Sequence, residues 1–248
     1  MRTVTEQALA ARLAEVSKGD PRVVVGGNFS TPWELVRIAN ATFHTWRAFV
    51  LNPQSGWPSR DGLVTETPFV GPGVRDDLAC VDYLPMRLSL VPRLFLTQRQ
   101  PDIVLFQCAP PRDGRVSLGV EVNLLPAAIE RVRDRGGLVI AQVNAKMPYT
   151  YGDAELDVDV VDFALEVDAP LPSPAARDSD DVAEAIGASV AAYATDGGTV
   201  QLGIGALPDS SARHLSGRRG LRVWTEMASD GVLGLEHAGA LDLSLIHI

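Results

Sequence analysis

Apolar residues along the first part of the chain follow two patterns in turn, one at helical spacing and one in short continuous runs. Residues 5–17 place Leu9, Leu13 and Val16 at helical spacing, which predicts an amphipathic helix. Short apolar runs rich in β-branched residues follow, and these predict buried strands. The predicted strands are residues 23–25, 48–51, 103–108, 138–143 and 164–167. Strands that are apolar throughout and alternate with helices indicate an α/β fold, with an open parallel sheet covered on both faces.

The connections between these strands carry helix signals. The first predicted strand runs into Gly26 and Gly27, and Thr31-Pro32 then opens a helix through about residue 41. A second helix over residues 127–135 ends at Gly136-Gly137, as helices often end at glycine. The pattern is therefore a series of strand-loop-helix units.

A proline-rich stretch interrupts this pattern. Residues 170–174 contain three prolines, which lack the amide donors that a helix or central strand needs. After it the strand-loop-helix order restarts, with a helix over 182–194, a strand over 199–202 and a helix that ends at residue 215. We therefore predict a first domain over residues 1–172 and a second over 178–242.

The second predicted domain is short. Two strands and about two helices do not close a core of their own, so we expect an incomplete α/β domain with an uncovered apolar face. The last residues, 243–248, resemble the translation of an adapter used in DNA library preparation. We expect them to be a non-native tail, with the natural sequence interrupted near Asp242. The alternative is a short β-strand at a natural terminus.

The net charge and the lengths of the apolar stretches argue against some classes of function. The formal net charge of -9 argues against a nucleic-acid partner, which favours a basic surface. No stretch approaches the roughly 18 consecutive apolar residues of a membrane span, and the N-terminus lacks the apolar region of a signal peptide. A cytoplasmic location is the resulting expectation.

The sequence contains no residue spacing that indicates a metal site or a redox motif. Cys80 and Cys108 have no CxxC spacing, and Cys108 ends an apolar run, so we interpret it as a small buried hydrophobe. The histidines share no ligand spacing; they are His44, His214, His237 and His247. We expect no metal site and no permanently bound cofactor.

Glu226 is the candidate nucleophile. It follows the end of a predicted strand at residues 223–225, and ligands of open α/β sheets bind beyond the carboxyl ends of strands. A carboxylate there can form a covalent acyl intermediate. The alternative is a structural role, in which Glu226 or Asp230 caps the helix that follows.

Two further groups of residues follow predicted strands. Gly203 and Gly205 lie between a strand and a helix, where glycine lets the backbone approach a ligand and the helix N-terminus offers amides to an anion. A simple tight turn explains the same residues. Gln142 and Asn144 end another strand, and their amides suit a carbonyl or carboxylate ligand, or else satisfy the loop backbone.

Together these stretches resemble the acetyl-CoA hydrolase/transferase family, which includes the 4-hydroxybutyrate, succinate and acetate CoA-transferases. The runs that carry the resemblance are Gly-Ile-Gly-Ala-Leu-Pro-Asp at 203–209 and Thr-Glu-Met-Ala-Ser-Asp-Gly at 225–231, together with residues 67–73, 112–119, 141–148 and 150–153. Several spaced motifs in the same order make this resemblance more specific than any one of them, and it covers nearly all residues to Asp242.

The resemblance implies two related α/β domains with an active site between them. It implies ping-pong transfer of coenzyme A between an acyl-CoA thioester and a short-chain carboxylic acid, with Glu226 as the nucleophile and a glutamyl-CoA thioester as intermediate. The residues that it implies for oxyanion stabilisation or CoA binding are Gly203, Gly205, Gln142, Asn144, Gly26 and Gly27.

The chain also departs from the family pattern. Residues 28–30, Asn-Phe-Ser, are not the commonest form of the early loop, and Ala145 stands where the family often has proline. The family's Gly-Gly-Gln loop has no counterpart here, so we expect this chain by itself to be inactive.

Three other functions stay open at this point. The first is an acyl-CoA hydrolase of the same family, and the second is a binding module in which Glu226 is structural. A sugar-phosphate isomerase would need a basic phosphate site, for which Arg213, Arg218 and Arg219 are the candidates. A homodimer is the default assembly for a soluble oligomer.

Overall fold

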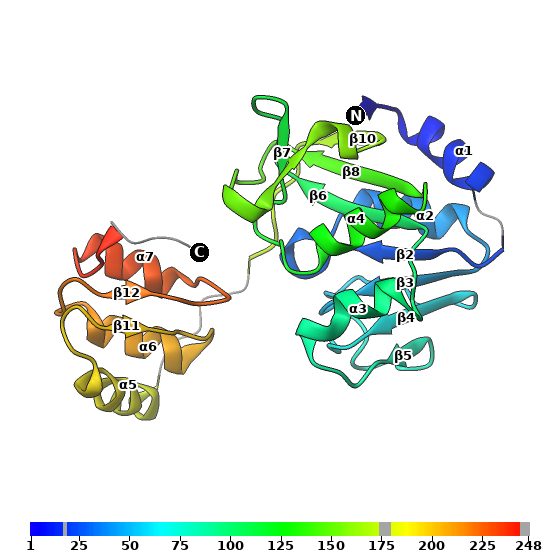
Figure 1. Ribbon diagram of the computed structural model, residues 1–248. Coiled ribbons are helices and arrows are strands. Elements are labelled where there is room, and N and C mark those ends of the chain that lie inside the picture. The colour runs from blue at the N-terminus through cyan, green and yellow to red at the C-terminus, as the bar shows by residue number, and fades with distance from the viewer. Residues whose placement is uncertain (17–18, 174–179, 244–248) are drawn as a thin grey trace. The chain divides into compact units, whose positions relative to one another are not determined.

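The structure of the chain is a computed structural model that describes residues 1–16, 19–173 and 180–243 (Figure 1). The chain divides into two compact units, Met1–Ser173 and Pro174–Ile248. The predicted domain limits near 170–178 fall partly outside the described residues, and they remain predictions. Of the predicted tail, only Leu243 belongs to the described part.

The first unit is built on an eight-stranded sheet in which all neighbouring strands are parallel. In spatial order the strands are β1 (Arg2–Thr3), β10 (Phe163–Val167), β8 (Leu138–Asn144), β6 (Ile103–Cys108), β2 (Arg22–Val25), β3 (Trp46–Val50), β4 (Leu63–Thr67) and β5 (Val81–Tyr83). The predicted open parallel α/β sheet is confirmed. The chain adds β3, β4 and β5 on one side of β2, then crosses to the other side for β6, β8 and β10. The switch point between β2 and β6 is where open α/β sheets bind ligands.

Helices cover both faces of this sheet (Figure 1). On one face, α1 (Glu6–Val16) and α2 (Trp33–Thr42) pack on a core that contains Leu9, Leu13 and Trp46. On the other face, α3 (Val91–Leu96) and α4 (Leu125–Asp134) pack on a second core around Phe95 and Phe106. Apolar side chains on both faces of each central strand explain why these strands read as continuous apolar runs.

Cys108 is fully buried in the second of these cores, which confirms its interpretation as a small hydrophobe. Burial raises the pKa of its thiol to about 12. The thiol therefore stays protonated at neutral pH, and it is a poor nucleophile because the thiolate is the reactive form.

The sequence patterns missed the outer part of the sheet. Strands β4 and β5 and helix α3 were not predicted, and neither was the small antiparallel pair of β7 (Arg115–Ser117) and β9 (Glu155–Asp157). Short 3-10 turns at Asn28–Ser30, Leu88–Leu90, Gly152–Ala154 and Val158–Val160 complete the connections.

Gly27 lets the loop after β2 approach the end of β3. A Cβ at Gly27 would lie 2.0 Å from the backbone oxygen of Leu51, whereas a Cβ at Gly26 would meet no heavy atom nearer than 3.5 Å. We expect Gly27→Ala to destabilise the unit by about 1–3 kcal/mol, because backbone must move to relieve the clash. Gly26→Ala is the matched control. Urea unfolding of the two variants measures the difference, and equal midpoints would contradict the prediction.

Over residues 180–243, the second unit contains three helices and one pair of strands. They are α5 (Asp181–Tyr193), β11 (Thr199–Val200), α6 (Ala206–Leu215), β12 (Arg222–Val223) and α7 (Asp230–His237), and β11 and β12 pair in parallel. Helix α5 begins where the sequence predicts, because the Asp180 side chain accepts a hydrogen bond from the Ala183 amide at 2.8 Å. The helices enclose a small core around Leu202, Leu215 and Leu235. The expectation that these elements close no core of their own is thus corrected.

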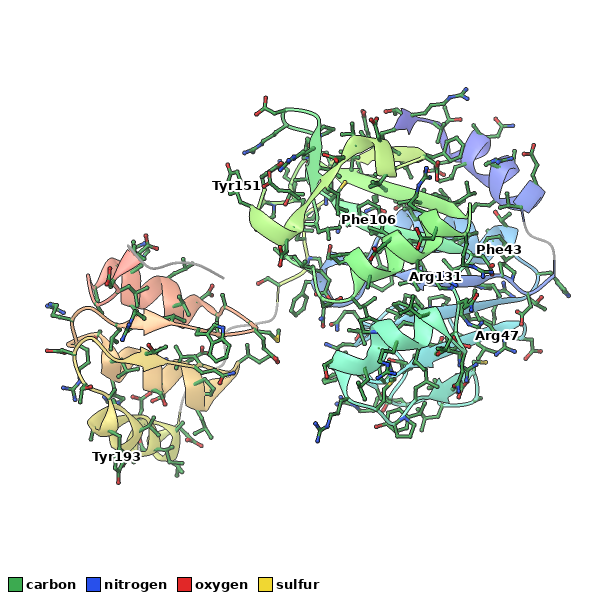
Figure 2. All side chains as sticks on the ribbon, in the orientation of Figure 1. Phe43, Arg47, Phe106, Arg131, Tyr151 and Tyr193 are labelled. Atoms are coloured by element: carbon green, nitrogen blue, oxygen red, sulfur yellow. The ribbon has the colours of Figure 1, made fainter. Side chains whose placement is uncertain are left out.

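Helix α5 also has an exposed apolar face. Its buried face packs Ala183, Gly187 and Ala191 toward the interior. The opposite face exposes Val182, Ile186, Val190 and Tyr193, and the Tyr193 side chain is 90% exposed (Figure 2). Within the described residues, α5 therefore exposes an apolar face, and the predicted incompleteness of this domain stays a prediction.

Candidate active site at the carboxyl ends of the strands

In the first unit, the loop after β2 lies at the switch point of the sheet. Gly26 continues β2, since its amide donates to Leu105 of β6 at 2.8 Å. Within the described part of the chain, the next amides, those of Gly27, Asn28 and Phe29, have no hydrogen-bond acceptor. Gly27 is buried, and a buried amide without a partner is rare in proteins unless water or a ligand satisfies it. The predicted role of Gly26 and Gly27 in substrate binding stays a prediction.

Gln142 and Asn144 extend from β8 toward the same edge of the sheet, and both are buried. The Gln142 Nε2 and Asn144 Nδ2 groups both donate to Gln107 Oε1, each at 2.9 Å. The Gln142 Oε1 atom accepts the backbone amide of Glu34 in the first turn of α2 at 3.1 Å, and Asn144 Nδ2 also donates to the Ala169 carbonyl at 2.9 Å. These amides tie β6, β8 and α2 together, and their predicted contact with substrate stays a prediction.

A buried carboxylate that the sequence patterns did not predict lies at this edge. Glu121, in the loop between β7 and α4, is 7% exposed and accepts hydrogen bonds from the Asn28 and Asn123 side chains. Burial raises the pKa of its carboxyl, and the bonds from the two asparagines oppose that rise. The available signal was a glutamate with one asparagine two residues after it and another in the loop after β2, which does not by itself predict burial.

In the second unit, Glu226 lies in the loop that joins β12 to α7. Its side chain is exposed, and within the described residues it has no hydrogen bond or ion pair. The adjacent Thr225 hydroxyl lies 2.5 Å from the Leu202 carbonyl in the loop after β11, and Ser229 Oγ donates to Asp209 of α6 at 3.0 Å. These contacts hold the Glu226 loop beside the loop that leads into α6.

Gly203 and Gly205 belong to that neighbouring loop. Gly205 has a φ of 111°, a conformation that residues with a side chain rarely adopt, and a Cβ there would meet no heavy atom within 4 Å. Within the described residues, the amides of Gly205, Ala206 and Leu207 at the start of α6 have no acceptor. The structure therefore brings together an exposed carboxylate loop and an open, amide-rich helix N-terminus, which suits an anion or an oxyanion.

Apolar side chains are exposed in the same two loops. Trp224 is 70% exposed, Ile204 57% and Met227 43%. Trp224 and Met227 flank Glu226 in the sequence, and Ile204 precedes α6. These side chains therefore supply exposed apolar surface in both loops.

The arginines of this unit do not assemble into an open phosphate site. Arg213 bonds Glu184, Arg218 donates to the Ala191 carbonyl, and Arg219 donates to the carbonyls of Ser216 and Arg218. Each of them thus bonds an acceptor of the protein itself, and these contacts give the isomerase alternative no support.

The predicted site residues thus form two sets. Gly26, Gly27, Gln142 and Asn144 lie at the carboxyl edge of the first unit's sheet, and Gly203, Gly205 and Glu226 lie beyond the strands of the second unit. Among the residues that the structure describes, no group of three His, Cys, Asp or Glu side chains is arranged to hold a metal ion, and no helix is long and apolar enough to cross a membrane.

Comparison with known proteins identifies the family. Residues 57–173 match the model of the acetyl-CoA hydrolase/transferase N-terminal domain. The chain is 38% identical to the 4-hydroxybutyrate coenzyme A transferase of Clostridium kluyveri over 178 residues, which are 70% of this chain and 41% of that protein. It is 30% identical to the succinyl-CoA:acetate/propanoyl-CoA:succinate CoA transferase of Fasciola hepatica, over 90% of this chain and 49% of that protein.

Solved structures share the fold. RipA from Yersinia pestis matches with a TM-score of 0.86 at 21% identity, over 97% of this chain and 59% of that one. The 4-hydroxybutyrate CoA-transferase from Porphyromonas gingivalis matches with a TM-score of 0.75 at 24% identity, over 97% of this chain and 58% of that one. The chain spans about half the length of the curated relatives that it matches. It belongs to the acetyl-CoA hydrolase/transferase family.

Proposed function

We propose that the protein containing this chain transfers coenzyme A from an acyl-CoA to a short-chain carboxylic acid, with Glu226 as the nucleophile. The observation that carries the proposal is the exposed Glu226 carboxylate in a loop tied to the amide-rich start of α6. Relatives named for 4-hydroxybutyrate, succinyl-CoA, acetate and propanoyl-CoA support acids of this size as substrates.

The first half-reaction loads coenzyme A onto Glu226. A carboxylate oxygen of Glu226 attacks the thioester carbonyl, the carbon–sulfur bond breaks, and CoA leaves as the thiolate, which gives a mixed anhydride. The thiolate then attacks the Glu226 carbonyl carbon of this anhydride and expels the first carboxylate. The product is a glutamyl-CoA thioester, and the thioester bond is conserved.

The second half-reaction runs the same steps in reverse. The incoming carboxylate attacks the glutamyl-CoA carbonyl and expels the thiolate, and the thiolate attacks the new acyl carbonyl. The products are a new acyl-CoA and free Glu226. Each tetrahedral intermediate carries a negative oxygen, and the amides of Gly205, Ala206 and Leu207 are donors suited to stabilise it.

The difference between a transferase and a hydrolase lies in the acceptor. In a hydrolase, water resolves the glutamyl-CoA, whereas in a transferase a second carboxylate does. The polypeptide from the complete reading frame that contains these residues should be incubated with acetyl-CoA and ¹³C-labelled succinate or propanoate. New labelled acyl-CoA, detected by mass spectrometry, supports transfer. Release of free CoA without labelled acyl-CoA would establish hydrolysis and overturn the transferase proposal.

The covalent intermediate has its own test. With acyl-CoA alone, the peptide that contains Glu226 should gain the mass of CoA less one water, and hydroxylamine should convert the thioester to a hydroxamate. The 248-residue chain should be assayed in parallel.

Assembly and location are part of the same proposal. We propose a homodimer in the cytoplasm, where Cys80 and Cys108, both free in this structure, remain thiols. Light scattering on the purified protein measures the dimer, and fractionation of the producing cells measures the location.

A further inference from the structure

Glu121 is a buried carboxyl group without a cationic partner among the described residues. It is 7% exposed, yet among the described residues no Lys, Arg or His nitrogen lies within 4.0 Å of its oxygens. Glu66, the other buried glutamate of this unit, instead contacts three arginines. Burying a carboxyl without a counterion is costly, so such a group commonly marks a functional site.

Side-chain amides take the place of the cation. Asn28 Nδ2 lies 3.2 Å from Glu121 Oε1 and 3.1 Å from Oε2, and it donates to this pair. Asn123 Nδ2 also donates to Oε1, and Asn52 Nδ2 donates to the Asn28 Oδ1 atom. One carboxyl therefore connects the loops that follow β2 and β3 with the loop that precedes α4.

The three asparagines share an unusual backbone conformation. The φ angles are 47° at Asn28, 47° at Asn52 and 20° at Asn123. Asparagine tolerates this left-handed region better than most residues, but the conformation still needs support from its surroundings. The hydrogen bonds of the network hold the Asn28 side chain at both its oxygen and its nitrogen, and the Asn28 carbonyl accepts the Thr31 hydroxyl at 2.8 Å.

The conformation of Asn28 decides where the adjacent amides lie. The amides of Gly27, Asn28 and Phe29 are the ones without an acceptor at the switch point of the sheet. Successive amides of this kind form a binding site for a carboxylate.

We propose that Glu121 is a positioning residue for the acceptor acid, which holds Asn28 so that the amides of residues 27–29 bind the acceptor's carboxylate. This inference rests on the proposed CoA-transferase function, which needs a carboxylate site apart from the nucleophile. Glu121 itself touches neither substrate nor the reacting atoms.

The kinetic test uses the polypeptide from the complete reading frame. Glu121→Gln replaces one acceptor oxygen with a donor that faces the Asn28 amide, and we expect the KM of the acceptor acid to rise about tenfold with the KM of acyl-CoA unchanged. Glu15→Gln, an exposed carboxylate on α1, is the control and should change neither. Equal changes in the two KM values, or no change, would overturn the proposal.

Exchanging the hydrogen-bond donor and acceptor between positions 28 and 121 distinguishes a positioning role of Glu121 from general damage to the fold. In the Asn28→Asp, Glu121→Gln double variant, the new carboxylate at position 28 accepts from the new side-chain amide at position 121 and from Asn52. The oxygen of that new amide still accepts from Asn123, and the net charge is unchanged. We expect the acceptor KM, which each single variant raises, to return most of the way to its natural value in this double variant. If Glu121→Gln fails to fold, the double variant carries the test alone. A double variant no better than either single one would overturn the proposal.

A binding measurement distinguishes this inference from the proposed function. Acetate and succinate are titrated into the ¹⁵N-labelled 248-residue chain, and the amide signals of residues 27–29 are followed. Shifts that saturate in the natural chain and weaken about tenfold in Glu121→Gln support the inference even if no CoA transfer is found. Transfer by the complete polypeptide without such shifts would leave the proposed function standing and overturn the inference.

Discussion

Glu226→Gln is expected to abolish CoA transfer and to leave the fold intact. Glutamine is nearly isosteric but is a poor nucleophile, so no mixed anhydride or glutamyl-CoA thioester forms, and we expect kcat to fall by about a thousandfold or more. The Glu226 side chain is exposed and has no hydrogen bond or ion pair within the described residues. The melting temperature should therefore stay within about 2 °C of the natural value.

Two further variants sharpen this result. Glu226→Asp keeps a carboxylate but withdraws it by one methylene, and misplacement on that scale costs about a hundredfold in rate. Glu236→Gln, an exposed glutamate on α7, is the control for loss of a negative charge in the same unit and should keep full activity. Mass spectrometry of the peptide that contains residue 226 reports the thioester directly. A CoA adduct that still forms in Glu226→Gln would show that another residue is the nucleophile.

Glu66→Gln is expected to cause the largest loss of stability. The Glu66 side chain is fully buried in β4, 3.0 Å from Arg22, 3.0 Å from Arg99 and 3.6 Å from Arg47. Removing one partner of a buried ion pair leaves the remaining charges uncompensated, which costs about 3–5 kcal/mol. Here the three arginines are partly exposed, so solvent screens some of this cost, and we expect a value at the lower end of that range.

Unfolding in urea at neutral pH measures this loss. Trp57 is a suitable reporter, since its indole nitrogen donates to Thr65 of β4 at 2.9 Å, beside Glu66. Glu15→Gln on α1 removes an exposed pair with Arg12 and should cost less than about 1 kcal/mol. A loss from Glu66→Gln as small as that of the control would mean that this cluster adds little to stability.

The same cluster explains why the outer sheet was missed from the sequence. Strand β4 has the sequence Leu-Val-Thr-Glu-Thr, and a glutamate inside a short run reads as a loop or a surface strand. Its burial depends on Arg22 and Arg47, which lie on β2 and β3, and on Arg99, which follows α3. Those partners are distant in sequence, so no local pattern reveals that their charges are compensated.

The candidate site residues also divide into those that local sequence patterns predict and those that only the fold brings together. Glu226, Gly203 and Gly205 were predicted from the sequence because each follows a predicted strand or precedes a predicted helix. Gln142 and Asn144 were also found by position, but their partner Gln107 follows from the pairing register of β6 and β8. Glu121 was missed, because its burial and its asparagine neighbours come from loops that only the sheet brings together.

The sequence by itself determined the parallel α/β architecture, the family and the candidate nucleophile. Apolar periodicity and glycine or proline at element ends are local signals, and each is read within a few residues. The tertiary structure alone decided the order of the strands, the compensation of Glu66 and the network around Glu121. The physical reason is that buried polar groups must find partners, and the strand order determines which distant residues are near enough to supply them.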